Sequence, residues 1–339
     1  MSYPLHRFAA FVASCTVLLV LAGSLVTSTD SGLSVPDWPT TYGWNMFAFP
    51  PSKWVGGILY EHGHRLIAST VGFLTIVLAV WVAVQDSRRW MKWLGAAALG
   101  AVIAQGVLGG LTVLFFLPAP VSTAHAGLAE IFFCMTVAIA LFTSPRWLEG
   151  YGESRDSSEN HVLRRAATTT TALVYVQILV GATMRHTDAG LAIPDFPLMF
   201  GHLWPTHWDS KIAIHFAHRV GALIVALAVA WTAALVWSRD ARDARRRQQG
   251  ALTRPAGLLV ALVVVQITLG ALTVLTGRNV WINSVHVVCG ALVLTTSLVL
   301  TLRTWRTRFA MQAVRPKPDA TTATRSVRLQ ADGTTGVRA

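Results

Sequence analysis

The chain has 339 residues, of which 53% are hydrophobic and only 13% are charged. A soluble domain carries about 25% charged residues, so this chain has too little polar surface to cover a water-soluble globule of its size. The three cysteines all lie inside apolar runs, which argues against a disulfide scaffold. The formal net charge of +12 has to be interpreted from the positions of the basic residues.

A membrane-spanning helix needs about 20 mostly apolar residues. The first segment that meets this requirement can also be read as a signal peptide starting at Arg7, but it runs into a motif that recurs after the fifth segment, so we interpret it as a helix. The sequence predicts an all-α polytopic membrane protein with eight transmembrane helices. In chain order they cover 8–27, 62–84, 91–115, 123–142, 166–184, 213–237, 256–276 and 284–302.

The basic residues are concentrated on one predicted side of the membrane. Arg7, the connections after the second, fourth and sixth spans, and the segment after residue 302 carry 22 of the 28 Lys and Arg. Because basic residues favour the cytoplasmic side, we predict that both termini are cytoplasmic and that the loops 28–61 and 185–212 face outward. The positive charge is therefore a topology signal, and a nucleic-acid partner is not expected. The short N-terminus favours a bacterial cytoplasmic membrane.

Two long motifs each occur twice. Thr29–Pro39 reads TDSGLSVPDWP and Thr187–Pro197 reads TDAGLAIPDFP, with seven of eleven positions identical. QGVLGGLTV begins at Gln105 and QITLGALTV at Gln266, and a histidine follows each glutamine after 20 residues. Such matches at nearly constant offset predict that the two halves of the chain arose by duplication.

Each half contains four predicted spans, so both halves enter the membrane in the same direction. We expect a pseudo-two-fold axis along the membrane normal, in contrast to the inverted repeats of many transporters. The predicted domains are an N-terminal four-helix bundle, 1–150, and a C-terminal four-helix bundle, 160–302. Residues 303–339 have no apolar period and are predicted to form a disordered basic tail.

Four histidines begin even-numbered predicted helices on the outer side, at equivalent positions in the two halves. Ionisable groups in membrane helices are costly and usually functional. One imidazole from each of two facing helices suits axial ligation of haem iron, whereas zinc needs three or four close ligands and a di-iron site needs several carboxylates. We therefore predict one haem in each half, with His62 and His215 as the nearest competitors for the ligand role. The four predicted ligands are His64, His125, His218 and His286.

Arg65 and Arg219 directly follow two of these histidines. A guanidinium group pairs well with carboxylates, so both arginines are candidates for binding haem propionates at the outer interface. The alternative is that they extend toward lipid headgroups.

The halves differ at one informative position. EHGHR at 61–65 aligns with HFAHR at 215–219, so Glu61 is replaced by His215. A carboxylate one turn from a ligand histidine is a plausible base, and its presence in only one half suggests chemistry there and a permanent redox haem in the other half. The alternative is that Glu61 is a helix N-terminal charge favoured by the macrodipole.

With these motifs assembled, residues 8–302 resemble the haem A synthase family. The resemblance depends on EHGHR, on TDxGLxxPDxP in both halves and on QxxLGGLTV. It implies oxidation of the C8 methyl group of haem O to a formyl group through a hydroxymethyl intermediate, with oxygen taken from water. A haem O synthase would supply the substrate, and the electron acceptor has no motif, although a quinone is a candidate.

The resemblance also implies roles for single residues. Glu61 is the expected catalytic carboxylate. His64 and His125, with Arg65, are expected to bind the substrate haem O. His218 and His286, with Arg219, are expected to bind a resident haem b.

Many bacterial members of this family carry a cysteine pair in the first outer loop, and residues 28–61 contain none. Any disulfide-linked step is therefore in doubt for this chain. Two other functions use the same four histidines: a two-haem electron-transfer cytochrome, and a carrier that binds haem without altering it. Neither needs a carboxylate in one half only. A homo-oligomer is left open by the sequence.

Overall fold

The computed structural model describes residues 3–149, 159–242 and 250–313. This part of the chain is helical, with two isolated bridges, Thr41 to Trp44 and Met199 to His202, and no strands. The long helices are α1 (Tyr3–Ser28), α2 (Gly57–Gln85), α3 (Arg89–Leu114), α4 (Ala119–Thr143), α6 (Glu159–His186), α7 (Ser210–Arg242), α9 (Thr253–Leu275) and α10 (Val280–Ala313). Short helices are η1 (Met46–Ala48), η2 (Pro51–Lys53) and α5 (Pro145–Glu149).

Eight helices of the described chain are long and apolar enough to cross a membrane, which confirms the predicted number of spans. Several helices are longer than predicted, because polar residues continue them beyond the apolar segment that a span requires. Helix α6 begins at Glu159, although the predicted span begins at residue 166. The four predicted ligand histidines consequently lie six to eight residues inside their helices, about 9–12 Å along the axis, and not at the helix starts.

The predicted tail also requires a correction. Helix α10 continues through residues 303–313, which we expected to be disordered. Arg303 anchors this extension, because its Nη1 donates a hydrogen bond of 2.7 Å to the carbonyl of Ala251, and Thr304 is buried beside it. The rest of the predicted tail, 314–339, lies outside the described residues.

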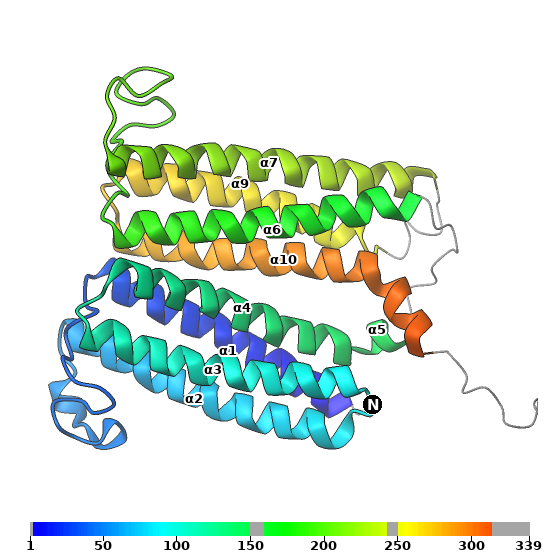
Figure 1. Ribbon diagram of the computed structural model, residues 1–339, viewed down its shortest axis with the longest axis horizontal. Helices are drawn as coiled ribbons and strands as arrows, with labels where there is room; N and C mark the ends of the chain where they lie inside the picture. Colours follow the sequence, from blue (N-terminus) through cyan, green and yellow to red (C-terminus); the bar gives the residue numbers. More distant parts are fainter. Residues whose placement is uncertain (1–2, 150–158, 243–249, 314–339) are drawn as a thin grey trace, which may run out of the picture. The chain divides into compact units, whose positions relative to one another are not determined.

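Helices α1 to α4 contact one another in a ring, α1 with α2, α2 with α3, α3 with α4 and α4 with α1. Helices α6, α7, α9 and α10 lie together beside them (Figure 1). Each group encloses its own hydrophobic cluster, with Leu78 and Phe132 in the first and Val229 and Leu294 in the second. Contacts nevertheless join the chain up to Thr304 into one compact unit, so the proposed domain boundaries stay a prediction.

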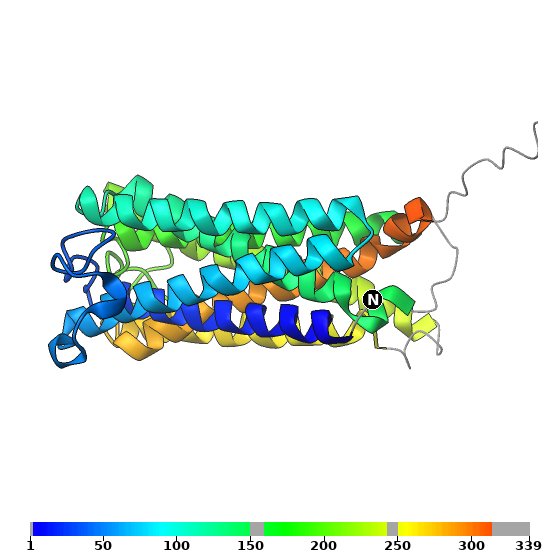
Figure 2. The same cartoon turned by 90° about the horizontal axis from the view of Figure 1, so that it is seen from below.

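Both long loops lie at the same end of the helices. Residues 29–56 and 187–209 extend from one end, and the chain's N-terminus lies at the opposite end (Figures 1 and 2). We call the end that carries these two loops the loop end. The short connections from α3 to α4 and from α9 to α10 are also at the loop end, so α2, α4, α7 and α10 all begin there.

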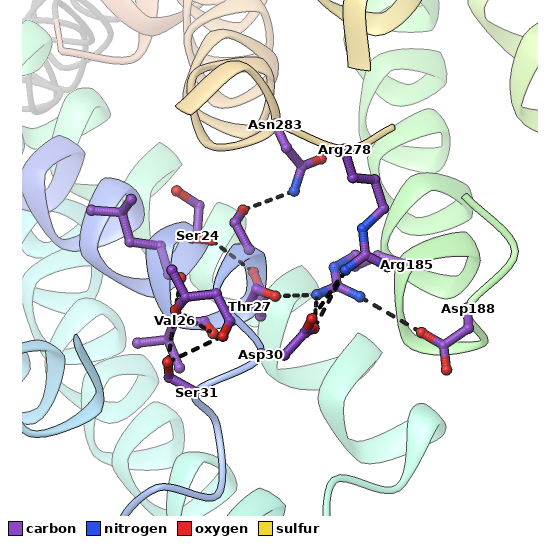
Figure 3. A network of polar contacts seen from close by, with 12 residues as sticks. Ser24, Val26, Thr27, Asp30, Ser31, Arg185, Asp188, Arg278 and Asn283 are labelled. Carbon is purple, nitrogen blue, oxygen red and sulfur yellow. Dashed lines mark hydrogen bonds and ion pairs between the residues drawn. The ribbon is translucent and has the colours of Figure 1, made fainter. Parts of the chain in front are cut away.

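A polar network joins the two groups of helices at the loop end (Figure 3). Arg185, near the end of α6, donates to the Thr27 carbonyl and to the Asp30 carboxylate, the latter over 2.8 Å. Arg278 contacts the same carboxylate at 3.3 Å. In the same network, Asn283 of α10 donates a buried hydrogen bond of 2.8 Å to the Ser28 hydroxyl. These contacts tie the end of α1 to α6 and α10.

Candidate functional site

The two TDxGLxxPDxP loops have the same local structure. Asp37 accepts hydrogen bonds from the backbone N–H groups of Tyr42 and Gly43, over 2.7 and 2.8 Å. In the second loop, Asp195 accepts from Phe200 and Gly201, both over 2.8 Å. The two glycines share φ values of 75° and 76°, a conformation that favours glycine. An aspartate therefore closes each loop into a compact turn.

These hydrogen bonds favour the charged aspartates. The N–H of Gly201 is the main cause that lowers the pKa of Asp195, and that of Phe200 adds to it. Partial burial raises the pKa of Asp37, but hydrogen bonds from Gly43, Thr40 and Tyr42 outweigh it and lower the pKa overall. Both loops are thus built around ionised carboxylates.

Arg65 and Arg219 donate hydrogen bonds to backbone carbonyls of these two loops. Arg65 donates to the carbonyls of Val35, Asp37 and Thr40 over 2.9, 2.8 and 3.0 Å. Arg219 donates to the carbonyls of Ile193, Asp195 and Leu198 over 3.1, 2.7 and 2.9 Å. Arg65 therefore fastens the first loop to α2, and Arg219 fastens the second loop to α7.

This role differs from the one that the sequence predicts. Arg65 also donates to the Glu61 carboxylate, so four of its contacts are taken by the protein itself. A guanidinium group has five N–H donors, which leaves too few for a bidentate contact with a propionate. Binding of propionates by Arg65 and Arg219 stays a prediction, and at Arg65 a bidentate contact would require the loop contacts to rearrange.

Glu61 is almost fully buried, with 3% of its surface exposed. Its Oε1 accepts from Arg65 over 2.6 Å, and its Oε2 accepts the N–H of Val35 over 2.8 Å. The carboxylate therefore lies between the helix and the underside of the first loop. It is held in one orientation by a charged donor and a backbone donor.

His62 and His215, the alternative candidates for the ligand role, contact the two loops. The Nδ1 of His62 lies 3.1 Å from the Thr41 hydroxyl, and its ring packs against Phe49 and Trp54 at centroid distances of 5.1 and 4.8 Å. His215 accepts the N–H of Ile193 at its Nδ1 over 3.2 Å. Both rings hold the loops through Nδ1, while the Nε2 of His62 is buried without a hydrogen-bond partner in the described protein.

Each predicted ligand histidine lies against a glycine of a neighbouring helix. A Cβ atom added to that glycine would come within 3.1, 3.3, 2.9 or 3.1 Å of the Cε1 atom of the imidazole, in the order given below. The distance at Gly181 is shorter than real Cβ contacts, and the other three are tighter than most of them, so the glycines make room for the rings. The four pairs are Gly23 with His64, Gly109 with His125, Gly181 with His218, and Gly270 with His286.

The four histidines are half-buried, and three of the rings have a buried nitrogen atom that makes no hydrogen bond. The Nδ1 atoms of His64, His125 and His286 are buried without a hydrogen-bond partner in the protein. Buried polar atoms are nearly always paired, so these nitrogens are available to a ligand. His218 differs, because the Nε2 of Gln177 lies 3.0 Å from its Nδ1 and donates to its carbonyl over 2.7 Å.

The histidines interact in the predicted pairs. His64 of α2 and His125 of α4 lie within electrostatic reach of each other, as do His218 of α7 and His286 of α10. Across the described ranges, no group of three or more His, Cys, Asp and Glu side chains has the geometry to hold a metal ion. Two neutral nitrogen donors from two helices fit the axial positions of haem iron.

Two features of the site were missed in the sequence. Gly23 and Gly181 are separated by 158 residues, the same offset as the loop motifs, so the repeat could have revealed them. Gln177 has no such signal, because its equivalent in the first half is Leu19. A polar residue in an apolar span was the only indication of its role.

The described helices define a polytopic membrane protein with a pair of histidines on two helices of each half. Comparison with known families identifies the family. Residues 6–298 match the model of the COX15-CtaA family, described as cytochrome oxidase assembly protein, and the chain belongs to this family.

Curated relatives are similar over most of their length. A protein from Symbiobacterium thermophilum is 32% identical over 80% of this chain and 85% of its own. Proteins from Halalkalibacterium halodurans and Caulobacter vibrioides are 28% and 29% identical, over 86% and 91% of this chain and 95% and 97% of their own. All three are named "Heme A synthase". The predicted family is thereby confirmed.

Proposed function

We propose that this protein is a haem A synthase, which converts haem O to haem A in a bacterial cytoplasmic membrane, with both termini in the cytoplasm. The observation that carries the proposal is the pairing of four half-buried histidines on two helix pairs, each against a glycine of a neighbouring helix, with a carboxylate one turn before His64 and none at the equivalent position of the second half. Family membership and the names of the relatives support it.

The overall chemistry consists of two oxidations of the C8 methyl group. In the first, the methyl group and water give a hydroxymethyl group, two protons and two electrons. In the second, the hydroxymethyl group gives the formyl group, again with two protons and two electrons. The proposed partners are a haem O synthase as supplier of the substrate and a quinone-class molecule as acceptor of the electrons.

In this assignment, His64 and His125 hold the substrate and fix the position of its edge relative to Glu61. Resident haem b, held by His218 and His286, would supply a one-electron redox centre. Gln177 contacts the Nδ1 of His218 and would orient its ring. The glycines opposite the four rings set how closely the helices approach each group.

Glu61 is the proposed base. Its Oε2 is hydrogen-bonded to the Val35 N–H, and its Oε1 is paired with Arg65. A proton taken up by either oxygen weakens these contacts, and the first loop is held by the same Arg65. Proton uptake at Glu61 is therefore linked to the hydrogen bonds that hold the first loop, because both involve the guanidinium group of Arg65. The buried position shields the carboxylate from bulk water.

Extraction and mass analysis of haem from purified protein, produced together with haem O, tests the proposal. The wild type should contain haem A or its alcohol precursor, and Glu61→Gln should accumulate haem O while keeping both haems. Gln is the appropriate substitution, because it is close to isosteric and still accepts the Val35 N–H.

Haem b alone in both proteins would overturn the proposal and favour an electron-transfer cytochrome or a haem carrier. Full conversion in Glu61→Gln, with haem A present, would keep the enzyme but remove Glu61 as its base.

A further inference from the structure

A second buried carboxyl group lies far from Glu61, in the middle of α4. Glu130 is eleven residues from the start of this helix and thirteen from its end, which places it about 16 Å below the loop end. Its surface is 5% exposed, and its Oε2 has no hydrogen-bond partner in the protein. The acidic residues of the other described helices all lie within a few residues of a helix end.

Glu130 belongs to the contact between α4 and α6. Tyr175 of α6 donates a hydrogen bond of 3.4 Å to the carbonyl of Gly127. A Cβ atom at Gly127 would lie only 2.7 Å from Leu179, so the two helices approach closely here. Tyr175 and Cys134, one turn further along α4, are the titratable side chains that interact electrostatically with Glu130 in the described structure.

The two helices of this contact each reach one of the predicted haem sites. Helix α4 carries His125, five residues before Glu130 and about 7.5 Å further toward the loop end. Helix α6 carries Gln177, two residues after Tyr175, and Gln177 contacts His218. Glu130 therefore lies on the helix pair that connects the two sites.

Placing a carboxyl group in the middle of a membrane helix costs free energy, and residues of this kind usually have a function. Ionisable side chains inside membrane helices are rare, and those of proton-transfer proteins form chains with neighbouring polar groups. In a medium of low dielectric constant, adding an electron to a buried redox group changes the local field strongly, and binding a proton nearby offsets the added charge. A carboxyl group whose oxygen is not committed to a protein donor can accept that proton.

We propose that Glu130 is a proton-binding site coupled to the resident haem: it takes up one proton when the iron held by His218 and His286 gains an electron, and releases it on reoxidation. This inference rests on the proposed function. The oxidation of the methyl group releases one proton for each electron, so it supplies both. On reoxidation, the electrons and protons reduce a quinone-class acceptor to its quinol.

Infrared difference spectra of the purified, haem-loaded full chain, reduced minus oxidised, test the proposal directly. We expect a carboxyl C=O band that appears on reduction in the wild type and is lost in Glu130→Gln. Cys134→Ser is the matched control, because it changes a neighbour on the same helix and should leave the band in place. Tyr175→Phe removes a polar neighbour and should shift the band.

Potentiometric titration of the same samples gives an independent measurement. The midpoint potential of the resident haem should fall as pH rises in the wild type and in Cys134→Ser, and this dependence should be lost in Glu130→Gln. A Glu130→Gln protein with unchanged spectra and unchanged pH dependence would overturn the proposal. If Glu130→Gln does not fold, the infrared spectra of Glu130→Asp and Tyr175→Phe test the proposal instead. A carboxyl band at the wild-type position in both variants would contradict the proposal.

These outcomes are separable from the proposed function. A wild type that binds haem but forms no haem A contradicts the proposed enzyme, whereas the infrared and potentiometric results still report on Glu130. Conversely, haem A formation with a pH-independent potential contradicts only the role of Glu130.

Discussion

Glu61 and His215 make the same contact in the two halves of the protein. Glu61 accepts the N–H of Val35, and His215 accepts the N–H of Ile193, which occupies the equivalent position 158 residues later. A loop-holding acceptor is thus required in both halves, whatever the chemistry. What distinguishes Glu61 is its charge and its ion pair with Arg65. The proposed catalytic carboxylate thus occupies a position whose structural task is the same in both halves.

This equivalence makes Glu61→His an informative substitution. The histidine can accept the Val35 N–H, as His215 accepts that of Ile193, so we expect the first loop to stay closed and both haems to stay bound. Oxidation of haem O should fall by at least about a hundredfold, within the range that general bases contribute. Haem content per protein and the ratio of haem A to haem O measure the two effects. Loss of haem together with activity would show that the charge is needed for folding of the site.

The glycines opposite the histidines predict a position-specific effect of a single methyl group. Gly181→Ala places a Cβ atom 2.9 Å from His218, so the ring must move and the haem of the second half should be lost. Gly257→Ala is the matched control, because this helical glycine has nothing within 4 Å of the added atom. Alanine favours a helix by about 1 kcal/mol over glycine, so the control should be as stable as the wild type or more stable.

Absorption of bound haem per protein, before and after purification, compares the two variants. Equal haem content in Gly181→Ala and Gly257→Ala would exclude close packing of His218 against α6.

The arginines that hold the loops should resist replacement by lysine. Arg65→Lys keeps the positive charge, but one ammonium group cannot reach carbonyls of three different residues as a planar guanidinium does. Each hydrogen bond to a charged donor contributes about 1.5–3 kcal/mol, so losing even one should increase exposure of loop 29–56 about tenfold. Limited proteolysis of the loop measures this exposure. The loop 187–209, held by Arg219, serves as the internal control and should be cleaved at the wild-type rate.

In the network between the helix groups, we expect the buried hydroxyl of Ser28 to contribute more to stability than the exposed ion pairs of Asp30. Asp30 pairs with Arg185 and Arg278, but its side chain is 71% exposed, so Asp30→Asn should cost at most about 1 kcal/mol. Ser28 is buried and accepts from Asn283, so Ser28→Ala strands a buried amide donor and should cost about 1–3 kcal/mol. Thermal unfolding midpoints in detergent compare the two, and a larger loss for Asp30→Asn contradicts the assignment.

The aspartates of the loops predict a loss of loop order in acid. Their pKa values are lowered in the folded protein, so their contribution to stability is complete above the ordinary aspartate range, about pH 4, and disappears as pH falls through the lowered values. Hydrogen exchange at the Gly43 and Gly201 amides should therefore show constant protection from pH 7 to about pH 5 and a loss below. In Asp37→Asn the protection of Gly43 should no longer depend on the charge, and its acid step should disappear.

The sequence predicts the helices well, because a continuous apolar segment is both necessary and sufficient evidence for a span. All eight are present. Their ends are poorly predicted, since hydropathy does not respond to the polar turns that extend α6 back to Glu159 or α10 on to Ala313. Contacts such as that of Arg303 with the Ala251 carbonyl are likewise invisible to hydropathy.

The candidate site is predictable where it repeats. His64 and His218 are identifiable because they occur at matching positions, and the replacement of Glu61 by His215 is visible in the same alignment. The partners of Arg65 are not predictable in this way, because they are backbone carbonyls, which every residue possesses. The sequence therefore predicts that Arg65 binds haem propionates, whereas in the structure the first loop takes up most of its N–H donors.

The manner in which the arginines hold the loops has a consequence for how this protein can change. Arg65 and Arg219 bind mainly main-chain oxygen atoms, which persist when a side chain is replaced. Residues at these loop positions can therefore be exchanged without releasing the loop, provided that the backbone keeps its path. The surface of the loop end is free to diverge between the halves, and between relatives, while the anchoring of the loops stays the same. Variation at this surface is thus separated from the geometry that the four paired histidines require.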